Sequence, residues 1–378
     1  MKFIHISDLH LGKRLHGFSL IEDQKWIMEQ ILEIVRTERP EAVLIAGDVY
    51  DRSQPSIEAV RLLDQFLVAL SATGTTVCMI SGNHDAPERV SFGASLMEKD
   101  HVFIAPVYDG TVRSVVFRDA WGTVRVHLLP FVKAVQVRAC FPEEAADTIT
   151  EALTTQIDHM DLDPEERHVL IAHQFVTGAF VSDSEDIRVG GEDPVSADVF
   201  RPFAYTALGH IHRPQNMGSD RVRYCGTPLK YSISEKDQLK SVTRVILEEP
   251  GNVKVDTIPL TSLRDVREIR GTYNELTSLS FYRDKKTDDL LYVVLTDEND
   301  VPDALARLRT IYPNIIQLEY DNTRTRSQGT LSEIRSIENK TPLELFETLY
   351  EQQNGQPMSE EQRSIADDLM RQIWKEQA

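Results

Sequence analysis

Cysteine is scarce in this 378-residue sequence: only Cys78, Cys140 and Cys225 occur, and they lie far apart. They form no pair with the spacing of a metal site, and an odd, sparse set argues against a disulfide framework. Such a set is typical of a reducing compartment, so we expect a cytoplasmic protein. A chain of this length can bury a sizeable core in one large domain with smaller appendages.

Long hydrophobic runs are also missing. No stretch of about 18 or more apolar residues occurs, so we expect no membrane-spanning helix. The chain enters a predicted strand almost at its first residue and meets Asp8 soon afterwards. This leaves no room for the apolar region of a signal peptide, and we expect no membrane association.

The chain has far fewer basic than acidic side chains. The chain carries 41 basic and 60 acidic side chains, a formal net charge of −19. A protein that binds nucleic acid by itself usually carries a basic patch, and this net charge repels a phosphate backbone at long range. Bound cations would neutralise part of the charge. A polymer substrate would then need a local basic face or a more basic partner. The charge does not exclude small-molecule substrates.

Short apolar strands alternate with helical patterns along most of the chain. The predicted strands cover residues 2–7, 42–46, 76–80, 102–105, 112–117, 124–129, 169–172, 204–208 and 242–247. Apolar spacing predicts helices near residues 27–35, 60–70 and 146–157, the last one opened by Pro142. The alternation indicates an α/β fold of layered sheets with antiparallel additions. In such sheets ligands bind beyond the carboxyl ends of the strands.

The composition changes after residue 260. Residues 267–322 are expected to form a small α+β unit with strands at 290–295 and 315–320 and a helix near 302–311. Residues 323–330 are polar and typical of a linker. Two amphipathic helices follow, with Leu343, Phe346, Leu349 and Tyr350 on the first and Ile365, Leu369 and Ile373 on the second. We therefore divide the chain into domains 1–266, 267–322 and 323–378.

Metal-binding side chains stand at five points where a predicted strand ends. They are Asp8 with His10, Asp48 after Gly47, Asn83 with His84 and Asp85, His173, and His210 with His212. This mixture of nitrogen and oxygen donors suits manganese, iron or zinc better than calcium. Two ions about 3.5–4 Å apart can activate a water and clamp the phosphoryl oxygens of an in-line displacement. The layout is that of a two-metal phosphoesterase.

Four of these residues have distinct expected roles. Asp48 can bridge two cations, because a carboxylate has two oxygens and a full charge. Asn83 offers a neutral carbonyl oxygen to the second ion. His84 need not be a ligand and is well placed as a general acid or as an electrostatic contact to the phosphate, with Asp85 orienting it.

Each pattern alone has a simpler interpretation. An Asp-x-His triplet is usually a surface loop, and Asn83 or Asp85 can cap a helix. His173 can be a hydrogen-bonded core histidine, although it follows a predicted strand. The ordered set after successive strands is far more specific than any one member. The remaining histidines lack such a context and are expected to be structural or exposed: His5, His16, His101, His127, His159 and His168.

The motif set resembles that of the calcineurin-like metallophosphoesterases. More closely, Ser7-Asp8-Leu9-His10-Leu11-Gly12 and Tyr224-Cys225-Gly226-Thr227-Pro228-Leu229 are similar to the SbcD-type nucleases. The resemblance covers the whole chain. It implies a layered metallophosphoesterase sandwich with a small α+β capping domain and a C-terminal helical pair.

The resemblance also implies two manganese ions and a catalytic histidine, His84. One ion would be held by Asp8, His10, Asp48 and His212, and the other by Asp48, Asn83, His173 and His210. Some relatives have a histidine where this chain has Asp51, so a second catalytic histidine is not expected from that position.

A reaction and partners follow from the same resemblance. SbcD-type nucleases degrade duplex DNA from 3′ ends and nick near hairpins or blocked ends, with an SbcC-like ATPase of the SMC-related class. Roles in DNA repair, recombination and replication and a homodimer within a heterotetramer are implied. The tail helices would dock on a partner coiled coil through Leu343, Phe346, Leu349, Ile365, Leu369 and Ile373. Alternatively, these helices pack on their own domain.

Two other functions stay open. A phosphatase or cyclic-nucleotide phosphodiesterase has the same metal-ligand pattern, but the additional C-terminal residues favour a nuclease. A non-catalytic scaffold of the same fold would be expected to lose ligands, and here every ligand position is filled.

Overall fold

The computed structural model describes residues 1–144, 146–185, 194–323, 325, 343, 346, 347, 349, 350 and 357–375. The chain divides into two compact units, Met1–Arg267 and Glu268–Ala378. The strands of the two large sheets belong to the first unit, a three-stranded sheet accompanies the second, and each unit has core clusters of its own. A further division near residue 323 stays a prediction, because much of that part of the chain lies outside the described residues.

The first unit contains two six-stranded sheets, of which the first has the order β14-β13-β1-β4-β5-β6. Its strands are β1 (Lys2–Ile6), β4 (Ala42–Ala46), β5 (Thr76–Ile80), β6 (Val102–Ile104), β13 (Ser241–Leu247) and β14 (Val253–Pro259). The strands β1, β4, β5 and β6 run parallel, whereas β13 is antiparallel to β1 and β14 to β13. The carboxyl ends of the parallel strands therefore share one edge of the sheet.

The second sheet has the order β11-β12-β10-β9-β8-β7. Its strands are β7 (Arg113–Asp119), β8 (Gly122–Leu128), β9 (Arg167–His173), β10 (Tyr205–Gly209), β11 (Gln215–Met217) and β12 (Ser219–Tyr224). The strands β8, β9, β10 and β12 run parallel, and the outer strands β7 and β11 are antiparallel to their neighbours. Apolar side chains from both sheets pack in one core, among them Leu44, Ile80, Val126 and Ile171.

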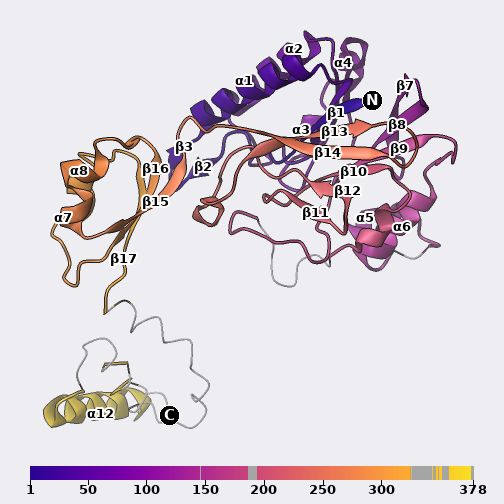
Figure 1. Cartoon of the computed structure of the whole chain (residues 1–378). Coiled ribbons are helices and arrows are strands. Elements are labelled where there is room, and N and C mark those ends of the chain that lie inside the picture. The colour runs from indigo at the N-terminus through magenta and orange to yellow at the C-terminus, as the bar shows by residue number, and fades with distance from the viewer. Residues whose placement is uncertain are drawn as a thin grey trace. The chain divides into compact units, whose positions relative to one another are not determined.

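Helices cover the outer faces of both sheets (Figure 1). The helices α1 (Ile21–Glu38) and α2 (Ile57–Ser71) lie over the first sheet, and α5 (Ala134–Cys140) and α6 (Ile149–Asp158) over the second. Short elements complete the unit: β2 (Arg14–Leu15), β3 (Phe18–Ser19), α3 (Pro87–Val90) and α4 (Ala94–Met97). The layers run helix, sheet, sheet, helix, and the predicted α/β class with layered sheets is confirmed.

Local sequence explains where α1 ends and where α2 begins. After α1, Arg39 adopts a left-handed conformation with a φ of 48°. The following residue is Pro40, whose ring disfavours a helical conformation in the residue before it. The Ser56 side chain caps α2, because its Oγ accepts a hydrogen bond from the Ala59 N–H at 3.2 Å.

One predicted helix begins later than expected. Pro142 does not open a helix and lies instead in a turn after α5, a helix that apolar spacing did not predict. The helix α6 begins at Ile149, because the side chains of Thr148 and Glu151 form a reciprocal capping box there. The capping residues, rather than the proline, decide this boundary.

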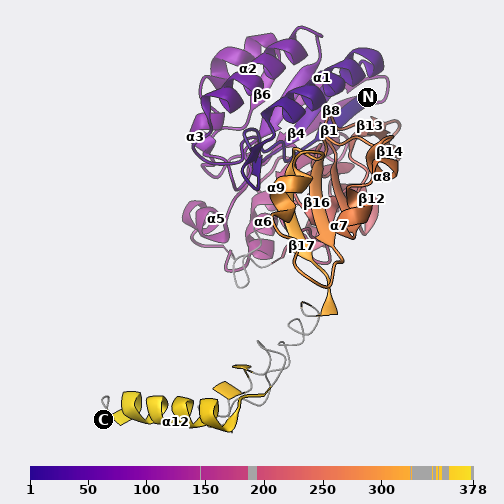
Figure 2. The same cartoon turned by 90° about the vertical axis from the view of Figure 1, so that its left-hand side faces the viewer.

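The second unit is a small α+β body (Figure 2). Its sheet has the order β15-β16-β17, formed by β15 (Val266–Gly271), β16 (Leu290–Leu295) and β17 (Ile315–Tyr320). The helices α7 (Tyr273–Leu276), α8 (Leu279–Tyr282) and α9 (Ala304–Leu308) accompany it. Leu276, Leu291 and Leu308 pack in its core. Both strands predicted here are confirmed, whereas the helix is shorter than the predicted span 302–311.

The tail is described in part. The second predicted tail helix is confirmed as α12 (Glu360–Lys375). Leu343, Phe346 and Leu349, from the first predicted tail helix, are also helical. Of the apolar side chains proposed for docking, four are exposed: Phe346, Leu349, Ile365 and Leu369. The side chain of Ile373 lies outside the described residues. Among the described helices, none combines the length and apolar character needed to cross a bilayer.

Candidate metal centre

The predicted ligands meet where parallel strands end. The strands β1, β4 and β5 lead into Asp8, Asp48 and Asn83, β9 ends with His173, and β10 is followed by His210. Among the described residues, three overlapping groups have ligand atoms within 4.8 Å of one another: Asp8, His10 and His212; His10, Asp48 and His84; and Asp8, Asp48 and His173. The fold thus brings side chains from distant parts of the chain to one place.

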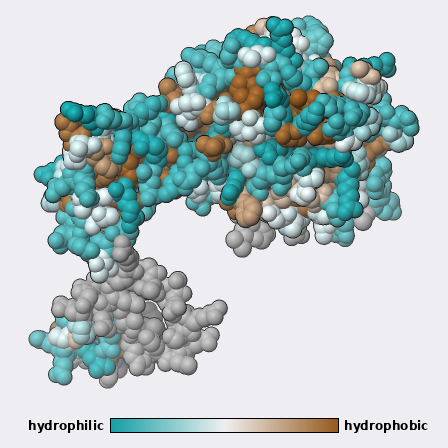
Figure 3. Space-filling model, viewed as in Figure 1, coloured by the Kyte–Doolittle hydropathy of each residue, from teal (hydrophilic) through white to brown (hydrophobic). Residues whose placement is uncertain are grey.

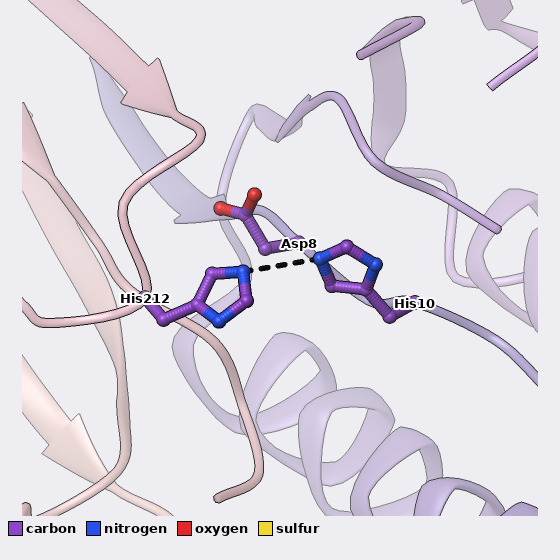
Figure 4. A group of neighbouring side chains, drawn as sticks. All are labelled: Asp8, His10 and His212. Carbon is purple, nitrogen blue, oxygen red and sulfur yellow. Dashed lines mark hydrogen bonds between the residues drawn. The ribbon is translucent and has the colours of Figure 1, made fainter. Parts of the chain in front are cut away.

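Asp8, His10 and His212 form the first group (Figure 4). The Nε2 atoms of His10 and His212 are 3.1 Å apart. The Asp8 carboxylate accepts a hydrogen bond from the His210 backbone N–H at 3.0 Å and another from the Ser7 hydroxyl. All three side chains of the group are buried. Two imidazole nitrogens and a carboxylate oxygen therefore lie within 4.8 Å of one another in a buried place, close enough to share one ion.

Asp48, Asn83, His173 and His210, the set predicted to hold the second cation, also lie close together. The Nε2 atom of His173 lies 3.4 Å from Asp48 Oδ2 and 2.9 Å from Asn83 Oδ1. Asn83 Oδ1 is also 2.9 Å from His210 Nδ1. Asp48 Oδ2 lies 3.6 Å from His10 Nε2, so this carboxylate stands between the two groups. That is the position a bridging ligand needs.

Hydrogen bonding orients the His173 ring toward the centre. Its Nδ1 lies 2.8 Å from the carbonyl oxygen of Ala46. Because a carbonyl only accepts, Nδ1 carries a proton, and Nε2 is the nitrogen on the side of Asp48 that would bind a metal once its own proton is displaced. A second-nitrogen bond of this kind is common in metal-ligating histidines. His173 is fully buried, as a core histidine would be, but its Nε2 faces the side-chain oxygens of Asp48 and Asn83 rather than apolar side chains.

Four of the predicted ligands have backbone conformations that residues with a Cβ rarely adopt. The φ angle is 52° at Asp8, 42° at His10, 48° at Asp48 and 101° at His210. Such conformations cost on the order of 1–3 kcal/mol each and cluster at functional sites. Glycine allows the close packing around them, since a Cβ on Gly82 would lie 2.1 Å from Asp48 Oδ1. Gly82 is therefore required at this position because the side chain of the predicted metal ligand Asp48 packs directly against it.

Burial and proximity shift the pKa values at the centre. Burial raises the pKa of the Asp8 carboxyl. Burial acts in the same direction on Asp48, but the imidazoles of His173 and His10 outweigh it and hold the pKa of Asp48 well below its usual range. Burial lowers the pKa of His173, yet Asp48 and Asp8 raise it overall to about 9. The centre therefore attracts positive charge.

The donor set fits divalent transition metals. Asp8 and Asp48 are buried carboxylates near one another, an arrangement that is costly without compensating positive charge. An amide oxygen and four imidazoles complete the set, and no cysteine takes part. Mixed nitrogen and oxygen donors without thiolate favour manganese, iron or zinc over calcium.

His84 stands beside the centre on the solvent side. Its backbone N–H donates to Asp48 Oδ1 at 2.9 Å, and its Nε2 lies 3.9 Å from Asp48 Oδ2. Its Nδ1 is 3.2 Å from the Asp51 carbonyl oxygen, and 23% of the side chain is exposed. The ring can therefore reach both the centre and a substrate that arrives from solvent.

Asp85 does not orient the His84 ring as expected. Its carboxylate accepts hydrogen bonds from the backbone N–H groups of Val49 at 3.0 Å, Tyr50 at 2.9 Å and Gly82 at 2.9 Å. It joins the two motif loops, and burial together with the nearby Asp48 raises the pKa of its carboxyl to about 7. The expectation failed because sequence adjacency does not show where a side chain points.

A buried network that was not predicted supports His212. Ser184 Oγ lies 2.6 Å from His212 Nδ1 and donates to Glu235. Lys240 Nζ donates to Glu235 Oε2 at 2.6 Å and to Thr227 Oγ1 at 2.7 Å. These hydrogen bonds place the proton of His212 on Nδ1 and leave Nε2 for the centre. Only Thr227, within the second quoted motif, gave a signal in the sequence.

Known protein families match parts of both units. The profile of the calcineurin-like phosphoesterases matches residues 1–214, and that of SbcD_C, the type 5 capsule protein repressor C-terminal domain, matches residues 262–354. A dimetal phosphatase from Danio rerio is 14% identical, with a TM-score of 0.38 over 68% of this chain and 95% of its own. A protein from Thermus thermophilus is 12% identical, with a TM-score of 0.38 over 68% of this chain and 98% of its own.

Proposed function

This chain belongs to the calcineurin-like phosphoesterase family, and we propose that it is a metal-dependent DNA nuclease. In the proposed activity it degrades duplex DNA from 3′ ends and nicks near hairpins or blocked ends. One observation carries the proposal: a phosphoesterase profile over residues 1–214 is followed in the same chain by the SbcD_C profile over residues 262–354. This succession of domains is the one expected of an SbcD-type nuclease.

The residues of the centre have assigned roles in this proposal. One cation would be held by Asp8, His10, Asp48 and His212, and the other by Asp48, Asn83, His173 and His210. Two such cations, proposed to be Mn²⁺, would supply Lewis acidity toward the phosphoryl group and a water that is nucleophilic at neutral pH. The position of Asp48 Oδ2 between His173 and His10 supports the bridging role.

His84 is the proposed catalytic histidine. Cleavage of a phosphodiester expels an alkoxide, so a nearby proton donor or positive charge lowers the barrier. His84 is partly exposed, and its Nδ1 faces the carbonyl oxygen of Asp51, which requires the Nδ1 proton. Its Nε2, 3.9 Å from Asp48 Oδ2, is then the nitrogen on the side of the centre that would donate to the leaving group.

We assign the partner role to an SbcC-like ATPase of the SMC-related class, in cytoplasmic DNA repair, recombination and replication. The exposed apolar side chains Phe346, Leu349, Ile365 and Leu369 of the tail support docking on a coiled coil. Figure 3 shows a mostly hydrophilic surface in one view, and the net charge is −19. A basic partner would help so acidic a chain to hold DNA.

A homodimer is part of the proposal, and an apolar face around α2 supports it. Val60, Val68, Phe92 and Leu96 are exposed there, Phe92 by 83%. A hollow of about 540 Å³ is lined by Val60, Val68 and Phe92. In a dimer with a two-fold axis, Phe92 of each copy can fill this hollow on the other copy. Phe92→Glu should therefore yield monomers in sedimentation experiments, whereas an unchanged dimer would exclude this face.

The test of the activity uses linear duplex DNA and a small aryl phosphodiester, with Mn²⁺, with and without the ATPase. We expect DNA cleavage that chelators abolish. His84→Gln should lower kcat by about 10²–10⁴-fold and keep both metals. The matched control is His101→Gln, an exposed histidine after α4. Hydrolysis of the aryl diester without any DNA cleavage would instead support a phosphodiesterase.

A further inference from the structure

An exposed aromatic side chain and an arginine contact each other close in the chain to the predicted ligand His212. The Phe180 ring is 68% exposed, and the Arg213 guanidinium carbon lies 5.5 Å from the ring centroid. Arg213 directly follows the predicted ligand His212, so the two Cα atoms are about 3.8 Å apart. A single exposed apolar residue is common and needs no explanation. Phe180 differs from such residues in two ways: it lies close in the chain to a predicted ligand, and hydrogen bonds hold its backbone in place.

The Phe180 loop is held at both ends. The Gln215 side chain accepts from the Phe180 N–H at 2.9 Å and donates to the Phe180 carbonyl oxygen at 2.8 Å. Four residues further on, Ser184 Oγ lies 2.6 Å from His212 Nδ1. Four residues span at most about 14 Å, so the ring lies within a few nucleotides of the centre. Because these hydrogen bonds order the loop before a ligand binds, less conformational entropy of the loop is lost when it binds.

Arg213 supplies a positive charge beside the Phe180 ring. Among the described residues Arg213 forms no ion pair, so its charge is available to a ligand. Elsewhere at the centre, Asp51 lies 3.8 Å from His10 Nδ1 and pairs with Lys13 at 2.8 Å and with the exposed Arg52 at 3.7 Å. Because Asp51 offsets part of the charge of these two cations, Arg213 supplies the positive charge that a phosphate backbone would meet beside Phe180.

We propose that Phe180 and Arg213 form a stacking platform for an unpaired nucleobase beside the phosphodiester that is cleaved. This inference rests on the proposed nuclease function and adds a specificity site to it. Aromatic rings and guanidinium planes stack on any base, so the platform selects unpaired over paired nucleotides rather than one sequence. A small aryl phosphodiester has no neighbouring base and does not use the platform.

The test compares Phe180→Ala with Trp121→Ala in the full chain with Mn²⁺. Trp121 is a matched control, because it is 54% exposed and lies in the turn between β7 and β8 of the same unit. The substrate is a labelled DNA duplex with a short unpaired 3′ end. Phe180→Ala should raise KM for this DNA about tenfold or more and leave kcat nearly unchanged. Phe180→Tyr should restore KM, and Trp121→Ala should not change it.

Two further measurements distinguish binding from damage to the centre. Metal content and hydrolysis of the aryl phosphodiester should be the same in Phe180→Ala and the unsubstituted protein. Fluorescence of 2-aminopurine at the unpaired 3′ end should be quenched on binding to the unsubstituted protein and less quenched by Phe180→Ala. Arg213→Lys keeps the charge but loses the plane, so it should also weaken the quenching.

The outcomes separate the platform from the nuclease function. An unchanged KM for DNA in Phe180→Ala, or an equal rise in Trp121→Ala, overturns the platform while the nuclease function stands. If the unsubstituted protein hydrolyses the aryl diester but leaves DNA intact, the nuclease function fails and the platform fails with it.

Discussion

Asp48 is the residue on which both groups of predicted ligands depend. Its Oδ2 lies 3.4 Å from His173 Nε2 and 3.6 Å from His10 Nε2, and its Oδ1 accepts from the His84 N–H at 2.9 Å. Because the groups share this carboxylate, Asp48→Ala should remove both cations and the activity together. The fold should persist, since the change also relieves repulsion between Asp48 and Asp8.

Metal content by mass spectrometry checks this prediction. The control is Asp220→Ala, which removes an exposed carboxylate on β12. Circular dichroism should show both variants folded, and only Asp48→Ala should lose metal. Two fully retained ions in a folded Asp48→Ala protein would exclude the bridging role.

Lys240 is a second residue with a testable role. It is buried, and its Nζ donates to Glu235 Oε2 at 2.6 Å and to the carbonyl oxygen of His212 at 3.1 Å. Removing one partner of a buried ion pair leaves the other charge uncompensated, at a cost of about 3–5 kcal/mol. Lys240→Met should therefore lower the free energy of unfolding by that order and weaken metal binding through the Ser184 contact to His212.

Urea unfolding of the metal-free protein and metal titration measure the two effects. The double variant Lys240→Met with Glu235→Gln removes both charges and should recover part of the lost stability. Equal destabilisation in the single and the double variant would show that the ion pair is not the cause.

At the scale of elements, β8 and β9 share a buried histidine pair. His127 Nε2 lies 3.0 Å from His168 Nδ1, and His168 Nε2 is 2.9 Å from the Asp163 carbonyl oxygen. Because that carbonyl requires a proton on His168 Nε2, His168 Nδ1 accepts from His127. Burial, and then the neighbouring His168, lower the pKa of His127 from 6.5 to about 4.

This shift makes stability depend on pH with a definite sign. The unfolded chain binds a proton at His127 below pH 6.5, whereas the folded chain binds it only near pH 4. The contribution is therefore fully present above pH 6.5 and is lost as the pH falls toward 4. In urea unfolding over this range, His127→Gln should show a shallower decline than the unsubstituted protein. Parallel curves for the two proteins would refute the assignment, and His101→Gln is the control.

At the scale of the whole molecule, the tail can be separated from the centre by deletion. The predicted ligands all lie in the unit Met1–Arg267, whereas residues 331–378 belong to the other unit. Deleting residues 331–378 should therefore leave metal content and hydrolysis of an aryl phosphodiester unchanged. It should abolish stable complex formation with an SbcC-like ATPase, because the exposed apolar side chains of Leu349 and Ile365 are lost.

Co-elution with the ATPase in size-exclusion chromatography measures the loss. The variant Leu349→Asp with Ile365→Asp tests the apolar contacts without a deletion, and Ser364→Ala, at an exposed position of α12, is the control. Co-elution of the truncated chain at unchanged affinity would refute tail docking, and so would a truncated chain whose catalytic unit is unfolded.

The sequence by itself determined the fold class and the residues that meet at the centre. The strands β4, β5, β16 and β17 lie at the predicted residues, because buried strands are continuous apolar runs and these carry a strong local signal. The convergence of Asp8, Asp48, Asn83, His173 and His210 was predictable, because parallel strands place their carboxyl ends on one edge and ligand chemistry is a property of residue type.

Only the tertiary structure decided how these residues are held. It showed that Asp85 joins two loops rather than the His84 ring, and that Ser184 and Glu235 support His212. It also showed which nitrogen of His173 faces the centre. These contacts join residues that are far apart in the chain or depend on the direction of a side chain. Local periodicity carries neither kind of information, because it reports which residues are buried and not which atoms they meet.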